Sequence, residues 1–212
     1  MSIKIAVIPV TPLQQNCSIV WCEATMQAAI VDPGGDADRI QQAVKQTGVT
    51  VAKVLLTHGH IDHAAAATEV AEAFGVEIEG PGEADLPFLE SLPEQGKKYG
   101  IVGRVAKPAR WLGQGDTVTV GELTFEVRHC PGHTPGHVIF LYEPEKIAIV
   151  GDVIFQGSIG RTDLPLGDTD QLLASIRDQV LTLSDDWGIL PGHGPTSSIG
   201  EERRHNPFLQ GL

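Results

Sequence analysis

Three of the chain's eight histidines fall within six residues, in the stretch LLTHGHIDH that ends at His63. An apolar run, residues 51–56, leads into this cluster, and an alanine-rich run, residues 62–74, starts inside it. The first run predicts a buried strand, and the second predicts a helix that Gly75 ends. Any fold for this chain must therefore place the histidines where a strand passes into a helix.

The spacing within H-x-H-x-D-H is suited to holding cations. His58 and His60 lie two residues apart, so in an extended segment their side chains point the same way. Asp62 and His63 fall at the start of the helix and offer a second grip. Imidazole and carboxylate ligands suit zinc, iron or manganese better than calcium or magnesium. The cluster therefore predicts a metal site.

Three later residues can complete such a site. His133 lies in HCPGHTPGH, Asp152 in IVGDVIF and His193 in LPGHGP, each in a loop at the end of an apolar strand. Loops at strand ends are where folded scaffolds tend to carry their active residues, and a catalytic metal usually has three protein ligands. We expect these three side chains to join the first cluster.

Two strand-rich halves follow one another along the chain. Apolar runs predict strands at 3–10, 18–22, 28–31 and 51–56, and again at 117–120, 123–128, 137–142, 146–150 and 188–190. Helices are expected from a cap at Asp36 to residue 47, and at 62–74, 84–92, 168–183 and the C-terminus. This order predicts a two-sheet sandwich covered by helices, forming one domain over residues 1–212.

The composition narrows the classes of function. A net charge of −12 leaves no basic footprint for nucleic acid or an anionic membrane, so we expect neither as a partner. No run of about 18 apolar residues occurs, and residues 3–10 resemble a strand rather than a signal peptide. Cys17, Cys22 and Cys130 are unpatterned, which is typical of buried thiols in a reducing cytoplasm. We expect a cytoplasmic protein that is monomeric by default.

One segment stands out against this acidic background. Residues 97–111 gather basic and aromatic side chains: Lys97, Lys98, Tyr99, Arg104, Lys107, Arg110 and Trp111. The segment either faces an anionic substrate or forms a solvated loop with two packed aromatic rings.

The ligand phrases together resemble the metallo-β-lactamase-fold hydrolases, and more closely their glyoxalase II-like branch. The resemblance runs nearly end to end, through NCSIVWC, VDPGGD, LLTHGHIDH, HCPGHTPGH, GDVIFQGSIGRTDLPLGD and LPGHGPTSSIGEERRHNPFL. It implies an α/β fold, an αββα four-layer sandwich in which two mixed sheets are flanked by helices. The phrases around Arg161 and His193 narrow the match to the shorter bacterial hydroxyacylglutathione hydrolase-like proteins.

The resemblance also implies a role for each ligand. By motif position, one divalent ion would be held by His58, His60 and His133, and a second by Asp62, His63 and His193, with Asp152 bridging the two. Zinc is the first expectation for both ions, and iron or manganese are the alternatives. Asp62 and Asp152 would also take part in catalysis.

The implied reaction is hydrolysis of S-D-lactoylglutathione to D-lactate and glutathione. A water between two such ions loses a proton near neutral pH, and the hydroxide attacks the thioester carbonyl. The leaving thiolate has a pKa near about 8.5, so a dedicated general acid is not required. Arg161 matches the position of a basic residue that meets the glycine carboxylate of glutathione; a structural salt bridge is its alternative role.

Three departures from the longer glyoxalase II enzymes affect substrate recognition. Only residues 194–212 follow His193, so we expect this protein to lack the helical C-terminal domain of those enzymes. Asp163 and Pro195 stand near places where those enzymes have aromatic residues. Residues 64–67 are alanines in place of a glycine-containing stretch. We therefore expect weaker or broader recognition of the glutathione portion.

Other reactions fit part of the pattern. Persulfide dioxygenases, which hold one iron by two histidines and a carboxylate, share the GRTD phrase at residues 160–163. A lactonase could use the same hydroxide to open a ring. The PGHGP phrase around His193 favours the hydrolases, and a non-enzymatic scaffold would have lost ligands that this chain retains. We therefore place thioester hydrolysis first.

Overall fold

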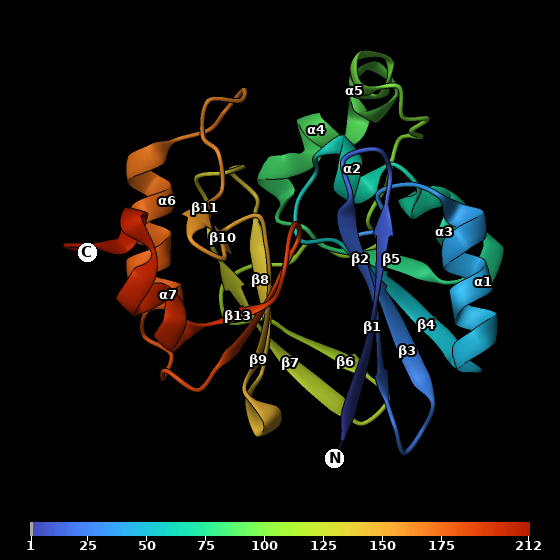
Figure 1. The fold of residues 1–212 in the computed structure, drawn as a ribbon. Coiled ribbons are helices and arrows are strands. Elements are labelled where there is room, and N and C mark those ends of the chain that lie inside the picture. The colour runs from blue at the N-terminus through green and yellow to red at the C-terminus, as the bar shows by residue number, and fades with distance from the viewer. Residues whose placement is uncertain (1) are drawn as a thin grey trace.

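Two β-sheets face each other, and helices cover the outer face of each (Figure 1). The structure is a computed structural model that describes residues 2–212. The first sheet has the order β1 (Ile3–Val10), β2 (Gln15–Cys22), β3 (Gln27–Val31), β4 (Thr50–Leu55) and β5 (Glu77–Glu79). The first three strands pair antiparallel. β3, β4 and β5 run parallel, because helices occupy the connections between them.

The second sheet is also mixed. Its order is β13 (Ser197–Ser198), β12 (Gly188–Pro191), β9 (Ile147–Gly151), β8 (Val138–Tyr142), β7 (Leu123–His129) and β6 (Thr117–Val120). β9 and β12 are parallel, and the other neighbours are antiparallel. A two-stranded ribbon, β10 (Ile154–Phe155) and β11 (Ser158–Ile159), lies between β9 and the later helices along the chain.

The helices form the two outer layers and part of one edge. α1 (Ala37–Thr47) and α3 (Ala67–Phe74) cover the first sheet, and α6 (Thr169–Ser175) and α7 (Ile199–His205) cover the second (Figure 1). α2 (Ile61–Ala64), α4 (Leu86–Glu90) and α5 (Leu92–Tyr99) lie along the upper edge. Shorter helical turns span Glu83–Asp85, Glu143–Glu145, Ile176–Val180 and Pro207–Leu209. Within residues 2–212, no helix has the length and apolar character to cross a membrane.

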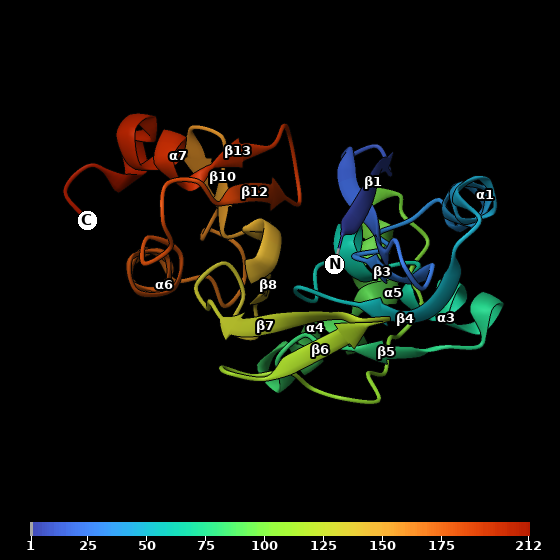
Figure 2. The ribbon, with the colours of Figure 1, turned by 90° about the horizontal axis from the view of Figure 1, so that it is seen from below.

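The buried apolar side chains form three layers. One lies between α1, α3 and the first sheet, one between the two sheets, and one between the second sheet and α6 and α7. Figure 2 shows this order from below, with α1 and α3 on one side of the sheets and α6 and α7 on the other. Cys17, Cys22 and Cys130 are buried free thiols within these layers, as predicted. The αββα sandwich of two mixed sheets is confirmed.

Several predicted elements differ in detail. The helix expected at 62–74 is two helices, because the N–H of Ala66 donates to the carbonyl of Pro33 and interrupts the helical pattern. Asp36 does not cap α1 with its side chain; its backbone is left-handed, and its carboxylate accepts from the N–H of Thr11. The helix expected at 168–183 is α-helical only over Thr169–Ser175 and continues as a π-helix over Ile176–Val180. Segment 80–115, expected to hold one short helix, also contains α5.

Candidate metal centre

The seven predicted ligands meet at the upper edge, from loops that follow four different strands. Two sets of three residues place potential ligand atoms within 4.8 Å of one another: His58, His60 and His133, and Asp62, His63 and His193. The first set comes from the loops after β4 and β7, and the second from α2 and the loop after β12. A third set, Asp32 with His58 and His63, overlaps both. The grouping agrees with the two sets implied by the sequence motif.

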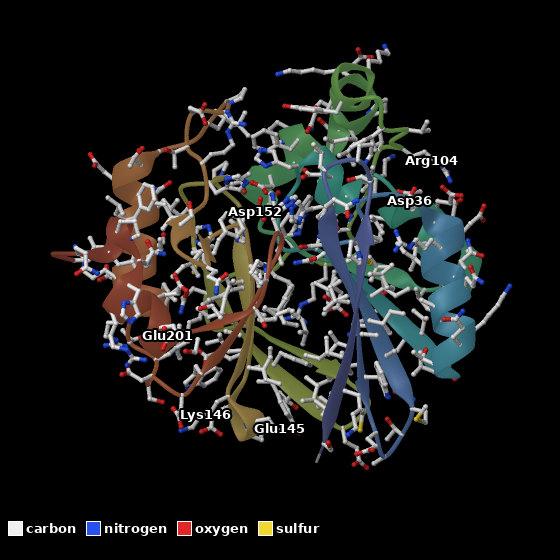
Figure 3. All side chains as sticks on the ribbon, in the orientation of Figure 1. Asp36, Arg104, Glu145, Lys146, Asp152 and Glu201 are labelled. Carbon is white, nitrogen blue, oxygen red and sulfur yellow. The ribbon has the colours of Figure 1, made fainter. Side chains whose placement is uncertain are left out.

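Asp152, just beyond β9, reaches both sets. Its Oδ1 lies 3.3 Å from Nε2 of His63, and its Oδ2 lies 3.6 Å from Nε2 of His133 and 3.7 Å from Nε2 of His193. Asp62 Oδ2 lies 3.1 Å from the same nitrogen of His193. Figure 3 shows Asp152 at the upper edge between the two sheets. A carboxylate in this place can serve two cations at once.

Unsatisfied polar atoms at the centre show that the residues fit metal ions. Nε2 of His58 is buried without a hydrogen-bond partner, and Nε2 of His63 and Oδ1 of Asp152, 3.3 Å apart, are buried with only each other in reach. Such groups are rarely left unpaired in a protein interior, because desolvation without a partner costs about 1–3 kcal/mol each. Imidazole nitrogens and carboxylate oxygens are ligands of zinc, iron and manganese. The donor set fits a dinuclear metal site.

Hydrogen bonds behind the ligands fix which ring atoms face the centre. Nδ1 of His63 lies 2.9 Å from Oδ2 of Asp32, and Nδ1 of His58 lies 3.1 Å from Oγ1 of Thr57. Thr57 in turn donates to Asp32 from its N–H and its hydroxyl, at 2.7 and 2.6 Å. The Nε2 atoms are therefore left to face inward, as in most protein metal sites. Asp32, at the end of β3, was not predicted to take part.

The His60 and His133 rings are oriented differently from each other. Nδ1 of His133 donates to the carbonyl of Arg161 at 2.7 Å, which turns its Nε2 inward. His60 presents Nδ1, 2.9 Å from Nε2 of His133. The ring of Phe88 packs edge-on against His60, with centroids 5.0 Å apart. Nδ1 of His60 and Nε2 of His133 therefore both face the space that a metal ion would occupy.

The charge states at the centre follow from burial and close carboxylates. Burial lowers the pKa of His58 far below its ordinary value and that of His60 to about 3, so both rings are neutral at pH 7. Burial alone would also lower the pKa of His63, but Asp152 and Asp32 together raise it well above 6.5. Burial opposes ionisation of Asp152, yet His63 and His133 hold its pKa well below the usual range. His58 and His60 thus have the neutral form that binds metal and Asp152 has the ionised form, whereas His63 carries a proton that a metal ion would displace.

His137 supports the centre from behind the ligands. Its Nε2 accepts from the backbone N–H of Asp152 at 3.0 Å, and its ring stacks on that of His58 with centroids 4.7 Å apart. Gln15 was not predicted; its Nε2 lies 3.4 Å from Nδ1 of His63. No motif surrounds Gln15 that could have indicated this contact.

Asp85 is a second residue that the sequence did not indicate. It is fully buried and accepts from the N–H of Gly59 at 2.8 Å, the hydroxyl of Thr134 at 2.8 Å and the N–H of Gly136 at 2.6 Å. Gly59 lies between His58 and His60, and Thr134 and Gly136 follow His133 in its loop. Burial raises the pKa of Asp85 to about 6 against the effect of these bonds. One carboxylate thus ties together the two loops that carry the first set of ligands.

Arg161 lies at the mouth of the centre in a salt bridge. It lines a cavity of about 360 Å³ whose other walls include His60, Asp62, His133, Asp152 and His193. Its guanidinium donates twice to the carboxylate of Asp163, both at 2.7 Å. Arg161 thus lines this cavity and also forms an ion pair, which was its alternative role.

The basic segment 97–111 is mostly engaged elsewhere. Arg104 pairs with Glu72, and Arg110 pairs with Glu79 and Asp116. Tyr99 lines the cavity beside Arg161. The segment therefore contributes one aromatic side chain to the cavity wall, and its arginines form surface ion pairs.

The metal-free protein is expected to lose stability as the pH falls below about 6.5. Unfolded histidines take up a proton near pH 6.5, whereas burial holds the pKa values of His58, His60 and His137 below this. The unfolded state then binds more protons, so stability falls with pH down to about 3, where His60 titrates. Asp85, with a raised pKa, acts in the opposite sense, but as one group against three. His63 is protonated in both states there and adds no slope.

The melting temperature of chelator-treated protein between pH 6.5 and 4.5, at constant ionic strength, measures this effect. A constant or rising melting temperature on acidification would contradict the buried, neutral state of these rings.

Comparison with known proteins agrees with the fold and the ligand pattern. The family model described as the metallo-beta-lactamase superfamily matches residues 10–193. Hydroxyacylglutathione hydrolase GloC of Haemophilus influenzae is 48% identical over 97% of this chain and 98% of that protein.

Two crystal structures show the same fold over nearly the whole chain. BLEG-1, a B3 metallo-beta-lactamase, superposes with a TM-score of 0.90 at 38% identity, covering 98% of this chain and 100% of that chain. TTHA1623 in a di-iron-bound form superposes with a TM-score of 0.88 at 34% identity, covering 96% and 100%. The chain therefore belongs to the metallo-beta-lactamase superfamily and is a metallo-hydrolase of that fold.

Proposed function

We propose that this protein is a metal-dependent thioester hydrolase of the glyoxalase II type, which converts S-D-lactoylglutathione and water to D-lactate and glutathione. The observation that carries the proposal is the position of Asp152, which reaches both ligand sets at the base of an open cavity. The 48% identity with hydroxyacylglutathione hydrolase GloC supports the choice of substrate.

The two ligand sets would hold two divalent ions, with zinc proposed first. His58, His60 and His133 would hold one ion, Asp62, His63 and His193 the other, and Asp152 both. Such a pair of ions supplies a nucleophile at neutral pH by lowering the pKa of water, and it polarises a carbonyl oxygen.

The protein's own side chains set the course of the attack. Asp62 and Asp152 line the cavity with ionised carboxylates, because neighbouring histidines keep their pKa values low. These carboxylates accept hydrogen bonds from the attacking water and fix its orientation. One of these carboxylates accepts a proton as an O–H bond of the water breaks, a bond forms between the water oxygen and the carbonyl carbon, and the carbon–sulfur bond breaks. The accepted proton passes to the departed thiolate, and the second water proton leaves to solvent when the lactic acid formed ionises to lactate. Because the pKa of its conjugate thiol is about 8.5, the thiolate leaves without a general acid.

Arg161 would bind a carboxylate of the thiol arm, and Asp163 would compete for it. We expect Asp163→Asn to lower KM for S-D-lactoylglutathione by about two- to fivefold with kcat unchanged, since exposed ion pairs contribute about 0.2–1 kcal/mol. Steady-state kinetics of the variant measure this. Asp178→Asn is the matched control, because Asp178 makes the same two-bond pair with Arg177 and does not line the cavity. A higher KM in Asp163→Asn would show that Asp163 assists binding instead.

The direct test is the loss of thioester absorbance from S-D-lactoylglutathione with protein of measured metal content. Rapid hydrolysis that a chelator abolishes and added metal restores is expected. Absence of hydrolysis by metal-loaded protein, together with oxygen uptake on glutathione persulfide, would assign the chain to persulfide oxidation instead.

A further inference from the structure

A second hollow lies beside the metal centre and shares part of its lining with the main cavity. Its walls come from α4, α5 and residues 164–166, and its volume is about 370 Å³. In Figure 1, these helices and the loop that leads to α6 rise at the same edge of the molecule. The two hollows share four lining residues: His60, Gln95, Tyr99 and Leu164. We call the second hollow the annexe; a molecule held at the centre can extend into it past His60.

The lining of the annexe is largely apolar. Phe88, packed on His60 and only 8% exposed, lies deep in it, and Leu166 stands at its rim with 61% of its surface exposed. Pro87, Leu164 and Pro165 complete the apolar wall. Apolar side chains that face water around a concave space gain free energy when an apolar group covers them. The annexe therefore suits an apolar group of moderate size.

The charged side chains at the annexe do not alter this character. Glu94 is paired with Lys97 at 2.7 Å. The Lys98 ammonium lies 5.2 Å from the centre of the Tyr99 ring. Both lysines are on the exposed side of α5, so the cations stand at the rim and leave the interior to the apolar residues.

The position of Arg161 decides which part of a substrate reaches the annexe. A thioester has two arms that diverge from its carbonyl carbon, the acyl group and the thiol. Arg161 lines the main cavity and does not line the annexe. If the carboxylate-bearing thiol arm lies toward Arg161, the acyl arm is directed past His60.

We propose that the annexe binds the acyl group, and that this chain prefers thioesters whose acyl group is longer and more apolar than lactoyl. The proposal rests on the proposed thioester hydrolysis and names its substrate class. A volume of about 370 Å³ lies in the range of about 300–1,000 Å³ found for ligand pockets, and the three carbons of lactoyl would leave most of it empty.

The test varies the acyl group while the thiol stays constant. For metal-loaded protein, kcat/KM is expected to rise by at least about tenfold from S-acetyl- through S-butanoyl- to S-hexanoylglutathione, whose carbonyls have similar intrinsic reactivity. In Leu166→Asp the rise is expected to fall below about threefold, because kcat/KM for the hexanoyl substrate falls more than that for the acetyl substrate. Leu166 has a φ of 64°, a conformation that aspartate adopts more readily than leucine, so the substitution does not disturb the fold. Val102→Asp is the control, because Val102 is 91% exposed and lines neither hollow.

Binding of thioethers gives a readout that does not depend on turnover. S-hexylglutathione is expected to bind metal-loaded protein at least about tenfold more tightly than S-methylglutathione in calorimetry, and Leu166→Asp to remove the difference. This difference without any thioester hydrolysis would reject the proposed function and leave the annexe as an apolar subsite. Equal kcat/KM along the acyl series, or equal losses for acetyl and hexanoyl in Leu166→Asp, would overturn the annexe proposal even if hydrolysis is confirmed.

Discussion

Asp152→Ala is expected to lower kcat for S-D-lactoylglutathione by about a thousandfold or more and to reduce the bound metal below two ions per chain. The carboxylate lies within 3.3–3.7 Å of nitrogens from both ligand sets, and its pKa is held low by these neighbours. Its removal would take one ligand from each ion and the carboxylate that lies beside His133, while Asp32 and Asp62 stay beside His63 and His193. Both losses slow the attack on the thioester. The decrease in kcat is therefore expected to exceed the decrease caused by removing any one residue that supports the ligands from behind.

Metal analysis and turnover on the same sample measure this prediction. Asp152→Asn serves as the close variant, because it keeps the size and one oxygen but not the charge, and it is expected to retain more metal than the alanine variant. Asp38→Ala, at an exposed position in the first turn of α1, is the control for handling and is expected to match the unaltered protein. Two tightly bound ions and full activity in Asp152→Ala would show that the carboxylate does not bridge the sets.

The meeting of the seven ligands could be predicted because each lies in a short motif directly after an apolar strand. The periodicity of apolar residues and the apolar runs predict those strands, and the strands form two sheets. The loops at one edge of the sheets then have to meet. Asp32 and Asp85 could not be assigned in this way. Their roles depend on which donors the folded chain brings to them, and neither has a spacing that marks it. Short sequence motifs therefore identify the ligands, whereas the residues that hydrogen-bond to the ligands are identified only from the tertiary structure.

Segment 80–115 shows the same limit for secondary structure. α5 contains Gly96, which lowers its helical propensity, and its sequence predicts a loop, although Pro93 stands in the first turn, where proline is tolerated. Tertiary packing nevertheless holds this segment as a helix. The chain after the helix folds back so closely that a Cβ atom at Gly96 would lie 2.1 Å from the carbonyl oxygen of Ile101. Glycine is needed there for the chain to fold back on the helix. The wall of the annexe is therefore built by a helix that only tertiary packing explains.

Asp85→Ala is expected to weaken metal binding at the His58, His60 and His133 set by about 10- to 100-fold, although Asp85 is not a ligand. The carboxylate holds the loop between His58 and His60 against the loop of His133 through three hydrogen bonds. Without it, three buried donors lose their acceptor at about 1–3 kcal/mol each, and the two loops can separate. The set of Asp62, His63 and His193 takes no residue from the His133 loop, so its affinity is expected to change less.

Competition with a chelator, read separately for the tight and the weaker ion, distinguishes positioning from general stability. Thr134→Val removes one of the three bonds at nearly constant shape and is expected to fall between the unaltered protein and Asp85→Ala. Val118→Ala, which opens a cavity between the sheets on β6, lowers stability by a route that does not touch the loops. If this variant, at a comparable loss of melting temperature, weakened the first ion as much as Asp85→Ala, the buried carboxylate would be acting through stability alone. A selective loss of one ion in Asp85→Ala cannot arise that way, because a fold loosened as a whole would release both.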